Sequence, residues 1–182
     1  YEQYGSGMIL RAYEERQLGL DNALDGVKVK YNPHKGIYLK GLVGKQRHLF
    51  NDGLTNGNGV IRGFDGEIDI NELFDTLTNS KFRLTVGGSF VSKFNDDNNT
   101  PDFILPKNVG SYAARIGMRY SKFRFSGEYV YKINDPYPYN LDDRFNYIYK
   151  NGEGLLLNLG YSKKGFAVDL SAKHMDNMLW RS

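Results

Sequence analysis

Apolar and polar residues alternate on both sides of Ser121 and Lys122, with Val130 the one apolar exception on the polar side. Residues 112–120 carry tyrosine, alanine, isoleucine and methionine at every second position, and residues 123–133 carry phenylalanine, glycine, tyrosine and isoleucine in the same way. Successive side chains of a β-strand point to opposite faces, so this pattern predicts two strands, each with one apolar and one polar face. The two-residue connection predicts an antiparallel hairpin. Each arm is about twice the usual strand length, which is typical of transmembrane β-barrels.

The same alternation predicts further strands along the rest of the chain. They lie at residues 26–31, 37–44, 60–69, 82–93, 155–162 and 166–173. Residues 8–16 suit either another strand or a helix. The alternation breaks at residues 71–80, where Asn71 can cap one or two helical turns that begin at Glu72. The pattern therefore predicts about eight or nine strands in residues 1–182.

Short and long connections alternate between these strands. The short ones are residues 32–36, 71–80, 121–122 and 162–165, and the long ones are residues 47–58, 95–107 and 135–151. In an up-and-down sheet, alternate connections lie at the same end, so the long loops gather at one end, as in outer-membrane barrels. The expected fold is all-β: an up-and-down antiparallel meander β-barrel of the outer-membrane type, or an open portion of a larger one. A soluble β-sandwich or a lipocalin-like barrel, which also alternates, is the alternative.

Aromatic residues recur beside the short connections. They are Tyr31, Tyr120, Phe123, Tyr161 and Phe166. Aromatic rings at the membrane interface form a girdle around a transmembrane barrel, so these residues are the expected aromatic girdle. Cross-strand aromatic pairing, which stabilises any hairpin, is the simpler reading of each single pair.

The first third of the chain resembles a known family. The similarity lies in YEQYGSGMILRAYEERQLGLDNALDGVKVKY and GIYLKGLVGKQR, and extends through VIRGFDGEIDINELF. These segments resemble a family of outer-membrane β-barrel proteins of Bacteroidota that is known only as a domain of unknown function. The resemblance implies an envelope location and a barrel longer than these residues. It supplies no active site.

Composition limits the function classes. The chain has 182 residues, enough for one domain, and 40% of them are hydrophobic. No apolar run is long enough for a transmembrane helix, whereas a barrel strand needs only alternate apolar residues. The 24 basic and 21 acidic residues are too balanced to indicate nucleic-acid binding. Because the chain starts at Tyr1 without a signal-like segment, residues 1–182 are expected to be a single barrel segment, a fragment of a longer chain.

No catalytic or metal-binding motif stands out. His34, His48 and His174 are isolated, and the chain has no cysteine. The acidic residues 95–99 lack the ligand spacing of an EF-hand loop and suit a solvated loop. We therefore expect no metal, no cofactor and no enzymatic activity.

Charged residues share the polar faces of the predicted strands. Asp65, Glu67 and Asp69 alternate along one strand, so their carboxylates point the same way and repel unless cations lie opposite. Arg83 and Arg115 are the best candidates for these cations, because arginine binds carboxylates with a planar fork. In a barrel this face lines the lumen, where such charges pair or line a channel more often than they catalyse. The predicted lumen charge network comprises Asp65, Glu67, Asp69, Arg83, Arg115, Arg119, Arg124 and Glu128.

Two function classes follow from these expectations. The first is a non-enzymatic protein of the bacterial outer membrane that acts as a pore or envelope scaffold, in contact with membrane lipid and with envelope proteins. The second is a glycan- or protein-binding module that uses its long aromatic loop, because aromatic rings stack on sugars and form contact patches. The loop residues in question are Tyr137, Tyr139, Phe145, Tyr147 and Tyr149.

Overall fold

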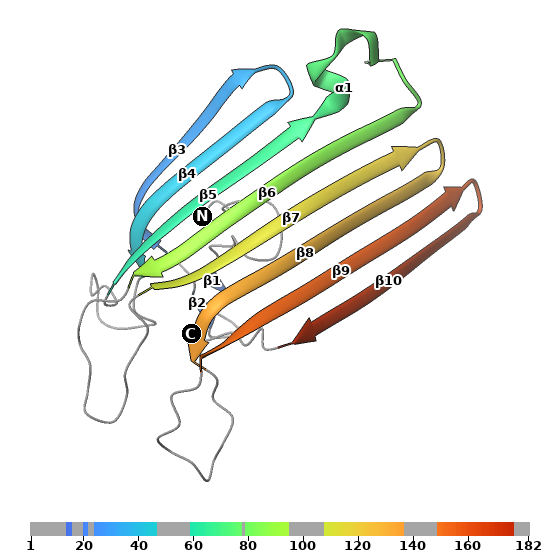
Figure 1. The fold of residues 1–182 in the computed structure, drawn as a ribbon. Coiled ribbons are helices and arrows are strands. Elements are labelled where there is room, and N and C mark those ends of the chain that lie inside the picture. The colour runs from blue at the N-terminus through green and yellow to red at the C-terminus, as the bar shows by residue number, and fades with distance from the viewer. Residues whose placement is uncertain are drawn as a thin grey trace.

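The computed structural model describes residues 14–15, 20–21, 24–46, 59–77, 79–94, 108–136 and 149–176. Within them, a single eight-stranded antiparallel sheet follows the order of the chain (Figure 1). Its strands are β3 (Leu24–His34), β4 (Ile37–Gln46), β5 (Val60–Asp69), β6 (Phe82–Phe94), β7 (Asn108–Tyr120), β8 (Phe123–Pro136), β9 (Tyr149–Lys163) and β10 (Phe166–Asp176). The predicted all-β meander is confirmed. Two short strands, β1 (Glu14–Glu15) and β2 (Leu20–Asp21), pair separately, and the rest of residues 8–16 lies outside the described residues.

The sheet is open. Strands β3 and β10 lie at its two edges, and among the described residues neither has a second neighbour. The closed barrel expected from the loop pattern is therefore not present in this sheet. The described strands form an open antiparallel meander, and its place in a barrel stays a prediction.

The tight connections lie at one end of the sheet (Figure 1). Each of three hairpins turns in two residues, and a residue with positive φ stands in each turn: Gly36, Ser121 and Gly165. The first turn is shorter than the predicted residues 32–36, because β3 continues to His34 through a register shift after Tyr31. The long connections 47–58 and 95–107 lie outside the described residues, and so do residues 137–148 of the third.

The fourth connection at this end is helical, as the break in alternation predicted. It contains the helix α1 (Ile70–Leu73) and the 3-10 turn η1 (Asp75–Leu77). The predicted cap was wrong. Asp69 caps the helix and accepts hydrogen bonds from the backbone N–H groups of Asn71 (2.9 Å) and Glu72 (3.1 Å). The helix begins at Ile70, before Asn71, so Asn71 already lies inside it.

Asn71 instead ties the connection to the start of β6. Its buried side chain donates to the carbonyl oxygens of Leu77 (3.0 Å) and Phe82 (2.7 Å). Its Oδ1 accepts from the backbone N–H of Leu84 at 2.9 Å. One amide thus bonds three backbone groups, of which the carbonyl oxygen of Leu77 also accepts from the backbone N–H of Ser80 at 2.9 Å.

The two faces of the sheet differ in polarity as the alternation predicted, and the polar face is the more buried one. Ile116 is 38% exposed and Tyr129 is 44% exposed, so the apolar face forms no packed core in the described structure. The buried hydrophobic residues are only Leu42, Ala113 and Val130 among the described residues. The buried polar ones are Asp65, Asn71, Ser89, Ser92, Glu128 and Lys132. No helix in the described part of the chain is long and apolar enough to cross a membrane.

Candidate functional site

The register of strands β4 to β7 assembles a charged cluster on the polar face. Lys40 of β4 pairs with Asp65 of β5, and Asp65 pairs with Ser89 of β6. Arg115 of β7 lies opposite Gly87, which is two residues from Ser89 along β6. Gly87 leaves the space that the guanidinium occupies, since a Cβ there would lie 2.9 Å from Arg115 Nη2. The arginine can therefore reach diagonally across β6 to Asp65.

Asp65 is the centre of this cluster. Its side chain is 1% exposed and has cationic and hydroxyl donors beside it. Arg115 Nη2 donates to its Oδ1 at 2.7 Å, and Ser89 Oγ donates to the same oxygen at 2.6 Å. Lys40 Nζ lies 3.7 Å from the other oxygen, and Arg115 Nη1 also donates to Ser89. A buried carboxylate is tolerated in a protein only when cations and hydrogen bonds compensate its lost hydration, as they do here.

The other two carboxylates of the predicted acidic row have different surroundings. Asp69 is occupied as the helix cap. Glu67 lines a hollow of about 200 Å³ together with Arg115 and Glu128. Glu128 lies directly opposite Arg115 on β8. The three carboxylates therefore do not share one set of cations. Asp65, and not Glu67, is the one that Arg115 and Lys40 bind.

Arg83, the second expected partner of the acidic row, lines a hollow together with Asp69, the last member of that row. It forms no ion pair within 4 Å among the described residues. Arg83 of β6 lies opposite Arg119 of β7, which lies opposite Arg124 of β8. We call these three residues the arginine row. The pairing of Arg119 with Arg124 could be predicted from the sequence, because the two-residue turn at Ser121 fixes which residues lie opposite.

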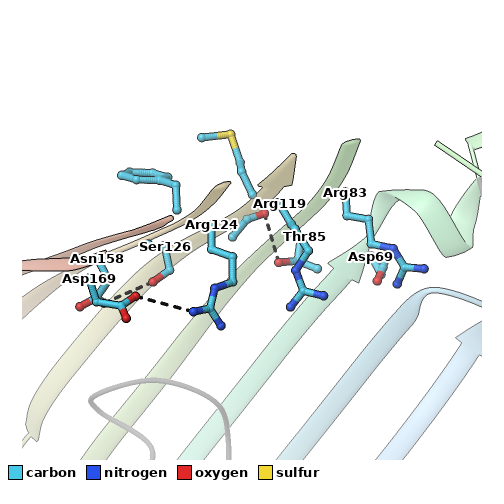
Figure 2. A pocket seen from close by; sticks show the side chains of 12 residues that line it. Asp69, Arg83, Thr85, Arg119, Arg124, Ser126, Asn158 and Asp169 are labelled. Atoms are coloured by element: carbon cyan, nitrogen blue, oxygen red, sulfur yellow. Dashed lines mark hydrogen bonds and ion pairs between the residues drawn. The ribbon is translucent and has the colours of Figure 1, made fainter. Parts of the chain in front are cut away.

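The arginine row lines a hollow of about 530 Å³ near the short-turn end of the polar face (Figure 2). The lining also includes Asp69, Thr85, Ser126, Asn158 and Asp169. Arg124 Nη2 lies 3.6 Å from Asp169 Oδ1, with side chains 57% and 70% exposed. Asn158 Nδ2 donates to Ser126 Oγ at 3.2 Å, and Thr85 Oγ1 donates to the carbonyl oxygen of Gly117 at 3.4 Å.

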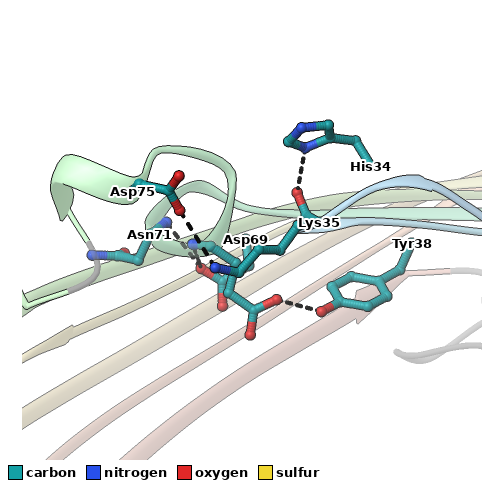
Figure 3. Close-up of polar contacts among 7 residues, drawn as sticks. His34, Lys35, Tyr38, Asp69, Asn71 and Asp75 are labelled. Atoms are coloured by element: carbon teal, nitrogen blue, oxygen red, sulfur yellow. Dashed lines mark hydrogen bonds and ion pairs between the residues drawn. The ribbon is translucent and has the colours of Figure 1, made fainter.

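Smaller polar contacts fix the helical connection against the first hairpin (Figure 3). Lys35 Nζ lies 3.4 Å from Asp75 Oδ1, and the hydroxyl of Tyr38 donates to Glu72. His34 Nδ1 donates to the carbonyl oxygen of Lys35 at 2.9 Å. The described residues contain no group of three or more histidine or acidic side chains that could hold a metal ion. His48 and the acidic residues 95–99 lie outside the described residues.

Aromatic side chains form two rows across the apolar face. The first row joins Phe82, Tyr120, Phe123 and Tyr161, which are directly opposite one another on β6 to β9. The rings of Phe123 and Tyr161 lie 4.8 Å apart, and those of Tyr161 and Phe166 lie 6.3 Å apart. Four of the five expected girdle residues thus lie in or beside this row. Tyr31 lies opposite Leu39 on β3, at the far edge of the sheet from β9 and β10.

The second aromatic row was not predicted from the sequence. It lies eight residues along the strands from the first, counted from Tyr120 to Tyr112 on β7. The rings of Phe90 and Tyr112 within it lie 5.0 Å apart. The signal was present, because each member shares the apolar parity of its strand. The row joins Phe64, Phe90, Tyr112 and Tyr131.

The aromatic loop expected to bind a glycan or a protein lies mostly outside the described residues. The loop residues outside the described part are Tyr137, Tyr139, Phe145 and Tyr147. Tyr149, expected in the same loop, is the first residue of β9, and its backbone pairs with Pro136. The described structure therefore adds no observation that favours the binding-module alternative.

Comparisons with known proteins place the chain in a family without giving it an activity. A family described as a family of unknown function (DUF6029) matches residues 1–182. Neither the curated proteins nor the solved structures contain a match to the chain.

Proposed function

We propose that this chain, which belongs to the DUF6029 family of unknown function, is part of a non-enzymatic β-barrel of the bacterial outer membrane and acts as a pore or envelope scaffold. The observation that carries this proposal is the inverted polarity of the sheet. Buried positions hold aspartate, glutamate, lysine, serine and asparagine, while large apolar side chains are exposed across all eight strands. Lipid is the surrounding in which this distribution is favourable.

The size of the apolar face supports the proposal. Eight strands give seven spacings of about 4.8 Å, or a width of roughly 34 Å. Eight residues between the two aromatic rows span about 27 Å along a strand. The product, roughly 900 Å², exceeds the largest apolar patch of a typical monomeric soluble protein, about 300–600 Å².

The spacing of the aromatic rows points in the same direction. Strands of outer-membrane barrels tilt by about 35–45°, so a separation of about 27 Å along the strand corresponds to about 21 Å along the membrane normal. The apolar band of such barrels is about 25 Å tall and is flanked by aromatic girdles. The two rows are therefore spaced as two interfacial girdles would be. Between them lie apolar or small residues such as Val86, Ala114, Ile116, Gly127 and Leu157.

Membrane placement is tested with the complete protein mixed with phosphatidylcholine liposomes and floated on a density gradient. The wild type should float with the lipid. Ile116→Arg places a charge on the apolar face and should reduce the floating fraction, because an arginine at the bilayer midplane costs about 2–4 kcal/mol. Ser126→Arg is the matched control: Ser126 is paired with Gly117, next to Ile116, but lies on the polar face. A wild type that stays in the aqueous fraction, or equal losses in both variants, would contradict the proposal.

Conductance across planar bilayers then separates the two roles. A pore gives discrete current steps, and a closed scaffold gives none. The compact pairing of Asp65 with Arg115 and Lys40 favours a narrow passage, because these side chains occupy the polar face that would line the lumen.

A further inference from the structure

The arginine row brings three like charges together on the polar face. Arg83, Arg119 and Arg124 occupy directly opposite positions on three adjacent strands. Like charges directly opposite in a sheet destabilise it unless anions answer them. We propose that the arginine row is a binding site for an oxyanion of the phosphate class. The proposal does not depend on membrane placement, because it concerns the face opposite the apolar one.

The nearby carboxylates leave the centre of the row uncompensated. Asp169 lies at one end and pairs with Arg124 at 3.6 Å. Asp69 lies at the other end of the hollow, and its Oδ1 accepts two backbone N–H groups. Within the described part of the chain, Arg119 and Arg83 have no carboxylate oxygen within 4 Å. The centre of the row thus carries net positive charge.

The geometry suits a multivalent oxyanion. Neighbouring strands lie about 4.8 Å apart, so the row spans about 10 Å from Arg83 to Arg124. The guanidinium groups project to the same side of the sheet (Figure 2). Each presents a planar fork of N–H donors, which matches the oxygens of a phosphate group. The hollow of about 530 Å³ leaves room for a phosphate or a diphosphate.

The contrast with Arg115 strengthens this assignment. Arg115 lies on the same face and donates to Asp65 and Ser89. The sheet can therefore supply an arginine with a buried carboxylate where it needs an internal pair. Arg119 is exposed and has no such partner among the described residues, so its donors remain available to a ligand.

Calorimetric titration of the complete protein in detergent micelles tests the site, with inorganic pyrophosphate as the probe at low ionic strength. The wild type should bind saturably. Arg119→Gln should weaken binding about tenfold or more, because a hydrogen bond to a charged group contributes about 1.5–3 kcal/mol. Arg119→Lys should fall between the two, since it keeps the charge and loses the fork. Lys122→Gln removes one positive charge from the adjacent turn and should change the affinity less than about twofold.

A parallel arm distinguishes a free anion from a lipid headgroup. The same variants are titrated into vesicles of phosphatidylcholine with and without phosphatidylglycerol. Selective loss in Arg119→Gln for pyrophosphate assigns the site to a free oxyanion, and selective loss for phosphatidylglycerol vesicles assigns it to a headgroup phosphate. The proposal is overturned if the wild type binds neither probe, or if Arg119→Gln and Lys122→Gln weaken binding equally. Far-UV circular dichroism of each variant confirms that the sheet is intact.

Discussion

Replacing Arg115 by methionine tests whether the stability of the sheet depends on the ion pair of Asp65, its most deeply buried charge. Arg115→Met keeps an unbranched apolar stem and removes the guanidinium with its charge and donors. Asp65, which is 1% exposed in the wild type, would keep the hydroxyl of Ser89 at 2.6 Å and Lys40 Nζ at 3.7 Å. Removing one partner of a buried ion pair typically costs about 3–5 kcal/mol. Because Lys40 remains nearby, we expect a loss near the lower limit, about 3 kcal/mol in the free energy of unfolding.

The chain offers a matched control and a rescue. Arg124→Met removes a pair that is 3.6 Å long and more than half exposed on both sides, so it should cost about 0–1 kcal/mol. The double variant Asp65→Asn/Arg115→Met removes both charges. It should be more stable than Arg115→Met alone, since the penalty comes from leaving one buried charge unanswered.

Urea unfolding followed by far-UV circular dichroism in detergent micelles measures these differences. The reasoning fails if Arg115→Met lies within about 1 kcal/mol of the wild type, or matches Arg124→Met. It also fails if the double variant is no more stable than the single one. Either result would mean that water compensates the charge of Asp65 in the folded protein.

Three further substitutions probe the backbone features of the sheet, each by urea unfolding. Gly36→Ala should destabilise the sheet more than Gly165→Ala. Both glycines have positive φ, but only at Gly36 would a Cβ meet backbone atoms, at 2.6 and 2.7 Å. We therefore expect a loss of about 1 kcal/mol in the free energy of unfolding for Gly165→Ala and at least twice that for Gly36→Ala. Gly87→Ala should destabilise by about 1–3 kcal/mol through overpacking against Arg115, whereas Gly41→Ala, with nothing within 4 Å, should not. Asn71→Ala should cost about 2 kcal/mol because the carbonyl oxygen of Phe82 and the N–H of Leu84 lose this partner, and an unchanged midpoint would show that water replaces the amide.

The strands could be predicted because their signal is local. A period of two is a property of extended backbone, and it is unusually clean where one face is apolar and the other charged. The hairpin around Ser121 even carried its own register, because a two-residue turn fixes which residues lie opposite. The pairs Tyr120 with Phe123 and Arg119 with Arg124 follow from that turn alone.

The partner of Asp65 could not be predicted in the same way. Strands β5 and β6 are joined by a helical connection, and its length does not reveal their register. The pairing of Asp65 with Ser89, and the space over Gly87 that admits Arg115, exist only once that register is set. The helix cap was misassigned for a related reason. Asp69 and Asn71 are both good capping residues, and tertiary contacts of Asn71 with β6 decide between them.

The open edges of the sheet limit what a membrane placement can mean. Strands β3 and β10 each expose a row of backbone N–H and C=O groups to no described neighbour. In hydrocarbon, each unsatisfied group costs several kcal/mol, so an open sheet edge is not stable there. If the apolar face meets lipid, the edges of β3 and β10 must therefore be paired in the membrane-bound protein. Amide hydrogen exchange of the liposome-bound protein tests this consequence. Protection of every amide along β10 is expected. Fast exchange at alternate amides of β10, the pattern of an edge strand in water, would contradict membrane insertion of this sheet.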